Sequence, residues 1–364
     1  MNHIVVRTNA GEYHPGDTVY GAVYLNIVNP TAGCGVRLKF RGYEYFAYGL
    51  GHGKGNDFPL FSDKKDYIDC NDIILYKNAS PLSLGSYVFP FQFSLLHEIP
   101  GSFNADGGED VRWEALVEYW VQTELIGAES VQAKQSLIVY QKTPNLQQAQ
   151  VAHHKVKCWF GLSQKNFSLT ARLLDPVHKC LGYANLRLLI ANQSSENVVS
   201  LTIKLNRELL LCTKYSSTTP LLNDPNIVRM DRKLWIQPEQ ESLTIWEHSI
   251  CEDHGGILNR GMDKIRIPLF TNNREAIPPT THGAHVQCRY KVVATVQLQN
   301  GQSCSVTVPV NSILPVGNRD WKFSELPEWI NNKLTVMATL PPFCVQSHIL
   351  YGEPFSGLPP FQQL

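Results

Sequence analysis

Apolar and polar residues alternate along most of this chain, and helical periodicity is scarce. In the segment 286–298, apolar side chains occupy every second position and polar ones lie between them, with Val293 as the single apolar exception. Such alternation places the two sets on opposite faces of an extended strand, so a long strand with one buried face is predicted. Asn300 and Gly301 follow, a pair that accepts the positive φ angles of a tight turn, and alternation resumes at Cys304. This region is predicted to form a β-hairpin.

The two halves of the chain resemble each other. A shift of 163 positions superimposes the apolar residues of 20–29 on those of 183–192. Later in each half, Ile99-Pro100-Gly101 and Ile277-Pro278-Pro279 lie between one alternating segment and the next. Any two β domains share a period of two, so alternation alone would produce part of this match. The turn residues match as well, which favours an internal duplication in which each half forms one β-sandwich.

Length and composition favour more than one domain. A chain of 364 residues exceeds what one core ordinarily supports, and 43% apolar residues are enough for packed cores. We predict an all-β chain of two tandem immunoglobulin-like β-sandwich domains, residues 1–143 and 151–316. The polar, glutamine-rich residues 144–150 form a predicted linker and residues 317–364 a predicted tail. Because the tail contains Trp321 and other large apolar side chains, part of it is expected to pack on the body.

Charge and cysteine usage limit the possible partners and compartment. The 32 basic and 32 acidic residues cancel, so no net field draws the chain to nucleic acid or to an anionic membrane. No segment resembles a secretory signal or reaches the ~20 consecutive apolar residues of a membrane-spanning helix. Nine cysteines without a tight pair fit reduced thiols better than a disulfide framework. We expect a soluble, cytoplasmic protein.

Signatures of catalysis or metal binding do not emerge from the sequence. The glycine-rich segment 49–55 lacks the spacing of a phosphate-binding loop, so an inter-strand loop is expected. His282, His285 and Cys288 lie three residues apart, which on a strand places neighbours on opposite faces. The histidines and carboxylates of 248–254 fit a solvated loop. We expect no enzyme activity, no cofactor and no metal.

One strand carries a pattern that favours partner binding. Arg37, Lys39 and Arg41 alternate with apolar residues and therefore share the outward face of a predicted strand. We call these three residues the basic ribbon. They are suited to bind phosphorylated or acidic partner segments through charge-assisted hydrogen bonds, and an ordinary solvated sheet face is the alternative interpretation.

Several motifs, in order, are similar to those of one protein family. The segment from Tyr13 to Gly21, Tyr-His-Pro-Gly-Asp-Thr-Val-Tyr-Gly, resembles the opening of arrestin-family amino-terminal domains. Further similar segments follow: Val36–Gly42, Ile99–Phe103, Lys157–Leu169, Asn192–Ser195, Pro278–Thr280 with Tyr290, and Val308–Val310. The resemblance covers roughly residues 4–316. No counterpart of the Val-Asp-Pro-Glu segment of receptor-desensitising arrestins is present, so the chain resembles the broader α-arrestin group.

The resemblance implies an adaptor or scaffold that binds membrane-protein cytoplasmic tails or signalling partners. It would couple them to trafficking, endocytosis or ubiquitin machinery, with recruitment to plasma membrane or endosomes through partners. Pro359, Pro360 and Phe361 are similar to the Pro-Pro-x-Tyr tails with which α-arrestins bind ubiquitin ligases, but Gln362 stands at the tyrosine position. Two alternatives remain, a structural subunit of a retromer-like sorting coat and an extracellular pair of immunoglobulin-like domains held by disulfides.

Overall fold

The computed structural model describes residues 1–50, 59–107, 113–143, 150–157, 164–194, 196–214, 227–230, 232–238, 243–251, 262–331 and 334–337. Nearly all regular structure in these ranges is β-strand, which confirms the all-β prediction. The helical segments described are α1 (Arg319–Phe323) and the 3₁₀ turn η3 (Glu328–Asn331). Neither of them has the length and hydrophobicity needed to cross a bilayer.

Strands β1 to β9 form two sheets, which we call the amino-terminal lobe. The first sheet has the order β1 (His3–Thr8), β3 (Thr18–Ile27), β6 (Gly85–Ser94), with β23 (Thr335–Val336) of the tail added at its edge. The second has the order β2 (Glu12–Tyr13), β9 (Ala128–Val139), β8 (Trp113–Ile126), β4 (Gly35–Leu50), β5 (Pro59–Lys77), and β7 (Phe103–Asp106) also pairs with β8. Buried apolar side chains of both sheets fill the space between them.

Strands β10 to β22 form the carboxy-terminal lobe. One sheet has the order β10 (Gln150–Lys157), β11 (Gln164–Leu173), β13 (Tyr183–Asn192), β18 (Met262–Pro268). The other contains β15 (Ile227–Met230), β16 (Lys233–Ile236), β14 (Val198–Lys214), β20 (Val286–Leu298), β19 (Thr281–His282), β17 (Leu243–Cys251) and β21 (Ser303–Val310). The short strands β12 (Val177–Lys179) and β22 (Ser312–Leu314) pair with each other. The pairing of β20 with β21 confirms the predicted hairpin.

The two lobes share one topology. The order β1-β3-β6 corresponds to β11-β13-β18, and β9-β8-β4 corresponds to β21-β20-β14. The short parallel pair of β2 with β9 also corresponds to that of β12 with β22. In addition, the Tyr119 hydroxyl donates to the carbonyl of Pro100 at 2.8 Å, and the Tyr290 hydroxyl donates to that of Pro278 at 2.7 Å. These shared features support the internal duplication, while the domain boundaries at 143 and 151 stay predictions.

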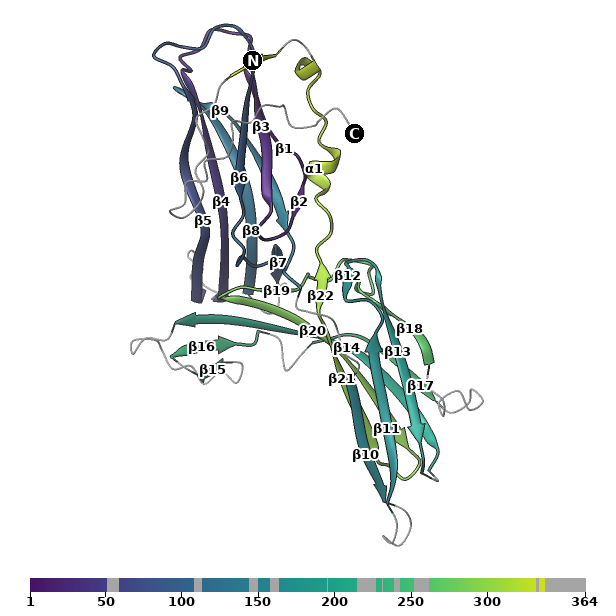
Figure 1. Cartoon of the computed structure of the whole chain (residues 1–364). Helices are drawn as coiled ribbons and strands as arrows, with labels where there is room; N and C mark the ends of the chain where they lie inside the picture. The colour runs from purple at the N-terminus through teal and green to yellow at the C-terminus, as the bar shows by residue number, and fades with distance from the viewer. Residues whose placement is uncertain are drawn as a thin grey trace.

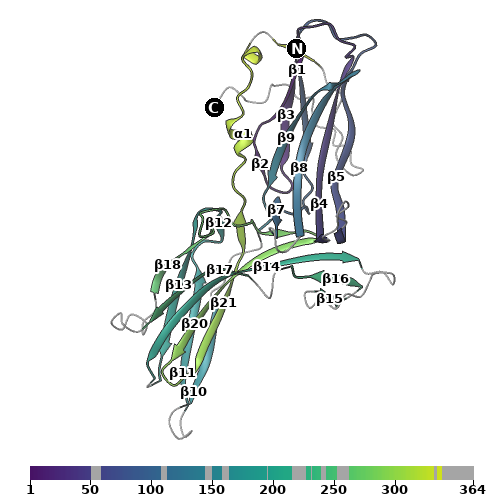
Figure 2. The same cartoon turned by 180° about the vertical axis from the view of Figure 1, so that it is seen from behind.

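Figures 1 and 2 show the lobes meeting end to end, with the chain after β22 returning along the amino-terminal lobe. There Trp329, Ile330 and Leu334 pack on the outer face of the first sheet, against a small buried cluster of Ala22, Tyr24 and Val88. The following β23 pairs with β6 in parallel. The expectation that part of the tail packs on the body is thus confirmed.

Candidate functional site

The basic ribbon lies on β4, where the alternation of the sequence is preserved. Val36, Leu38 and Phe40 are fully buried between the sheets. The side chains of Arg37, Lys39 and Arg41 are 30%, 28% and 20% exposed. They share the opposite face of the strand because successive strand residues point to opposite sides of a sheet. The three cations are therefore brought together on one surface, as the sequence predicted.

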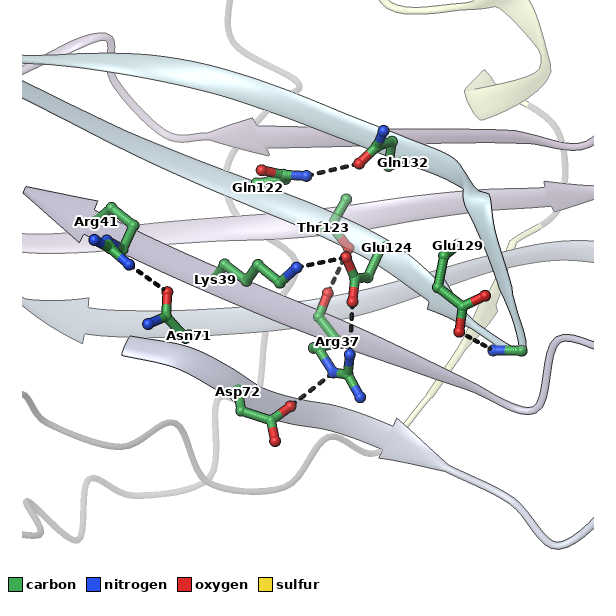
Figure 3. A network of polar contacts seen from close by, with 11 residues as sticks. Arg37, Lys39, Arg41, Asn71, Asp72, Gln122, Thr123, Glu124, Glu129 and Gln132 are labelled. Carbon is green, nitrogen blue, oxygen red and sulfur yellow. Dashed lines mark hydrogen bonds and ion pairs between the residues drawn. The ribbon is translucent and has the colours of Figure 1, made fainter. Parts of the chain in front are cut away.

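Carboxylates that the sequence analysis did not identify surround the ribbon (Figure 3). Glu124 on β8 forms ion pairs of 2.7 Å with both Arg37 and Lys39, and Asp72 on β5 pairs with Arg37 at 2.7 Å. Arg41 pairs with two aspartates of β5, Asp66 at 3.2 Å and Asp69 at 3.0 Å. Three cations thus face four carboxylates, and the ribbon is neutralised from within the sheet.

These carboxylates differ in how firmly they are held. The Glu124 side chain is only 7% exposed, and burial alone would raise its pKa. Hydrogen bonds from Lys39 and Arg37 outweigh that effect and hold the pKa of Glu124 below its ordinary value. By contrast, the Asp72 side chain is 70% exposed, so its pair with Arg37 is a surface ion pair of about 0–1 kcal/mol. Glu124 is therefore held in place by its two cations, whereas another acidic group could take the place of Asp72 on Arg37.

A second cluster lies at the lobe junction, the contact between the ends of β4 and β5 and the segment before β20. The fully buried Glu44 accepts a hydrogen bond from the backbone N–H of His285 at 2.8 Å. The Tyr67 hydroxyl accepts one from the N–H of Ala284 at 3.1 Å. The imidazole Nδ1 of His285 lies 2.7 Å from the carbonyl oxygen of Cys212. Backbone and side-chain groups of both lobes are therefore interlocked.

Burial raises the pKa of two titratable groups at the lobe junction. Desolvation raises the pKa of Glu44, opposed by the neighbouring His285, and raises the pKa of Tyr67, to which Glu44 adds. Among the described residues, the second carboxylate oxygen of Glu44 has no hydrogen-bond partner. It lies so close to Gly283 that a Cβ at that position would overlap it. A side chain at position 283 would therefore displace the carboxylate or separate the lobes.

A second set of hydrogen bonds joins the lobes beside this cluster. The Thr281 hydroxyl donates to the carbonyl of Gly101 at 2.9 Å. The side-chain oxygen of Gln141 accepts from the N–H of Gly101 and of His282, both at 2.9 Å. Buried apolar side chains of both lobes also belong to one continuous cluster. The junction is thus a specific contact with both polar and apolar parts.

The metal-binding groups, cysteines and loops considered in the sequence can be compared with the structure only in part. In the described ranges no three His, Cys, Asp or Glu side chains are placed to hold one metal ion. Seven of the nine cysteines are described, and none of these seven forms a disulfide within the described residues. Burial raises the pKa of the Cys180 thiol to about 12. Loops were expected at 49–55 and 248–254, but residues 49–50 form the end of β4 and residues 248–251 the end of β17, which pairs with β14. The rest of these segments, with Pro359, Pro360 and Phe361, lies outside the described residues.

Comparisons with known proteins agree with the fold. Residues 3–142 match the family model "Arrestin (or S-antigen), N-terminal domain". The chain is also 26% identical over 167 residues to "Arrestin domain-containing protein A" of Dictyostelium discoideum. That alignment covers 42% of this chain and 29% of the relative, so the chain spans less than a third of the relative's length.

Proposed function

The chain is an arrestin-family protein, and on this basis we propose that it is an adaptor that binds cytoplasmic tails of membrane proteins. It couples them to trafficking, endocytosis or ubiquitin machinery. The match of residues 3–142 to the arrestin amino-terminal domain carries this proposal. The two-sandwich architecture supports it, because extended sheet faces offer broad surfaces for protein contact.

The outer face of β4 is the surface that we propose for an acidic or phosphorylated partner segment. Acidic groups of the partner replace Asp72 on Arg37 and Asp69 on Arg41. These two aspartates are replaceable because their side chains are 70% and 49% exposed. Exposed ion pairs contribute little, so the exchange is nearly neutral in energy. Lys39 remains on the buried Glu124 and supports the strand. The partner thus contacts the two arginines that have exposed counterions.

Proximity labelling in cells tests both the adaptor role and the surface. The wild-type chain is expected to label membrane proteins or trafficking components above an unrelated β-sandwich control. Arg41→Gln should reduce that labelling, and Asp72→Asn, which removes a competing carboxylate from Arg37, should increase it. Lys204→Gln is the matched control, because Lys204 is an exposed cation paired with Glu247 at 3.1 Å in the other lobe.

The outcomes separate the possibilities. If wild type and Arg41→Gln label the same partners to the same extent, the surface on β4 is not the partner-binding site, and the adaptor role is unaffected. Absence of any membrane or trafficking protein above the control would count against the adaptor role itself. Recovery of the chain in fixed stoichiometry with the same few partners after affinity purification would favour a structural coat subunit.

A further inference from the structure

Arg7 is a buried cation without an ionic partner in the part of the chain that the structure describes. It lies on β1, with its side chain on the outer face of the first sheet, and is 7% exposed. Its guanidinium carbon lies 4.3 Å from the centre of a Trp321 ring. Contact with a ring satisfies none of the five N–H donors of a guanidinium. Arg7 therefore keeps its charge and its donors while it has lost most of its water.

These donors lie beside a cavity. An open cavity of about 780 Å³ lies between β1, β2 and the tail around α1, and Arg7, Glu12, Asn318, Arg319, Trp321 and Lys322 line it. Some described residues have side-chain nitrogen or oxygen atoms that are fully buried and have no hydrogen-bond partner. No nitrogen of Arg7 is among these atoms. The guanidinium is consequently held in the wall of the cavity and remains open to a molecule inside it.

The walls of this cavity are fixed by hydrogen bonds. The Trp321 indole N–H donates to the carbonyl of Thr8 at 3.0 Å. The side-chain amide of Asn318 donates to the carbonyls of Gly11 at 3.3 Å and Ser136 at 2.8 Å. A Cβ added to Gly11 would lie 2.8 Å from the Trp321 side chain, so the tail is in close contact here. The cavity is thus preformed, which lowers the cost of binding.

Charge in the cavity favours an anion. Arg7, Arg319 and Lys322 supply three positive charges, and Glu12 is the carboxylate that lines the cavity with them. Glu12 is already engaged, because it accepts hydrogen bonds from the Asn318 N–H and from the Tyr140 hydroxyl. Among the described residues, none of the three cations forms an ion pair. A buried unpaired charge is costly, and an anion with two or more oxygens would relieve that cost.

We propose that this cavity binds the phosphate or carboxylate group of a small organic molecule, with Arg7 as its principal hydrogen-bond donor. Arg319 and Lys322 contribute charge at the mouth of the cavity. Trp321 and Phe323 offer apolar surface for the rest of the ligand. The site is separate from the basic ribbon, whose cations lie on β4 and are paired.

Calorimetry on the full chain with three probes of one shape tests the proposal. Phenyl phosphate and benzoate carry the two proposed anions, and phenol is their uncharged control. At least one anion is expected to bind, and to shift the indole ¹H–¹⁵N resonance of Trp321. Arg7→Met should weaken that binding at least about tenfold, since one charge-assisted hydrogen bond accounts for a factor of that order.

Matched variants separate this role from a structural one. Arg266→Met removes another arginine whose guanidinium lies over a ring, 4.0 Å from Tyr183, and should leave binding unchanged. If Arg7→Met does not fold, Arg7→Lys decides the matter, because it keeps the charge and loses the paired N–H donors. Weakened binding in Arg7→Lys then supports the proposal. Equal affinity in wild type and the Arg7 variant, or binding of phenol as tight as that of the anions, or binding of none of the probes, would overturn it.

Discussion

Glu44 of one lobe accepts a hydrogen bond from the backbone N–H of His285 in the other, at 2.8 Å. Around this bond lie three further titratable groups, the imidazole of His285, Asp63 at 3.5 Å from that ring and Tyr67. Asp63 also accepts from the Thr213 hydroxyl of the other lobe at 3.0 Å. The strength of the lobe junction therefore depends on how much charge is buried within it.

This arrangement predicts a pH dependence that Glu44→Gln abolishes. Burial raises the folded-state pKa of Glu44 above its ordinary 4.5. Its contribution to stability is therefore full below that ordinary value and is lost as the pH rises through the folded-state pKa. A tenfold difference in proton affinity between the folded and unfolded states corresponds to ~1.4 kcal/mol of stability. Urea unfolding between pH 4.5 and 7.5 should show Glu44→Gln gaining stability relative to wild type as the pH rises.

Glu129→Gln is the control for that experiment, because Glu129 is exposed and, within the described ranges, accepts a hydrogen bond only from the N–H of Gly127 in the neighbouring turn. Its stability relative to wild type should not depend on pH in this range. A difference between wild type and Glu44→Gln that stays constant, or that changes in the opposite sense, would contradict the buried charge at the junction.

Glu124→Gln should show the opposite sign. The pKa of Glu124 is held low in the folded state, so its stabilisation is present above the ordinary carboxyl pKa and is lost as the pH falls through the folded value. At neutral pH the variant should lose about 2 kcal/mol, because hydrogen bonds to charged groups are of this order. Denaturant unfolding at pH 7 and pH 4 measures this, and a loss that does not shrink at pH 4 would refute it.

Tyr119→Phe and Tyr290→Phe should cost similar amounts of stability. Each removes one buried hydroxyl that bonds a proline carbonyl in equivalent corners of the two lobes. A lost hydrogen bond that leaves a buried acceptor costs about 1–2 kcal/mol. Urea unfolding followed by tryptophan fluorescence measures both variants. Tyr183→Phe, at a residue 42% exposed, is the control, and a loss confined to one of the two corners would argue against their equivalence.

Asn318→Ala should release the tail from the amino-terminal lobe. The substitution removes the bonds from Asn318 to two carbonyls and its cap on the N–H of Trp321 at 2.9 Å. A helix cap alone contributes about 1 kcal/mol. Hydrogen exchange should become faster in β1 and β6, which contact the tail. The exposed Asn197→Ala should leave exchange there unchanged, and the same result for Asn318→Ala would show that the tail is held elsewhere.

Alternation in the sequence was sufficient to predict the hairpin of β20 and β21 and the faces of β4. It placed the basic ribbon correctly on one side, because side-chain direction along a strand depends only on position. It did not reveal Glu124 or Asp72, because those residues reach the ribbon from β8 and β5. Partners across a sheet depend on strand register, which the pattern of one strand does not contain.

The two buried charges, Glu44 and Arg7, differ in how far the sequence indicated them. Glu44 has the same parity as Leu38 and Phe40, so alternation did indicate a carboxylate on the buried face, a signal that could have drawn attention to it. Arg7, by contrast, occupies an outward position that alternation assigns to solvent. It is buried because a tail more than 300 residues later covers that face. Only tertiary contact creates such a site.

The corner after Pro100 in one lobe lies against the segment after Pro279 in the other, where Gly101 accepts from Thr281. Repeated modules that meet near the same place resemble the two subunits of a symmetric dimer. Here they belong to one polypeptide, so their association is governed by a tethered, effective concentration and does not weaken on dilution. The arrangement of the two lobes is consequently independent of the protein concentration.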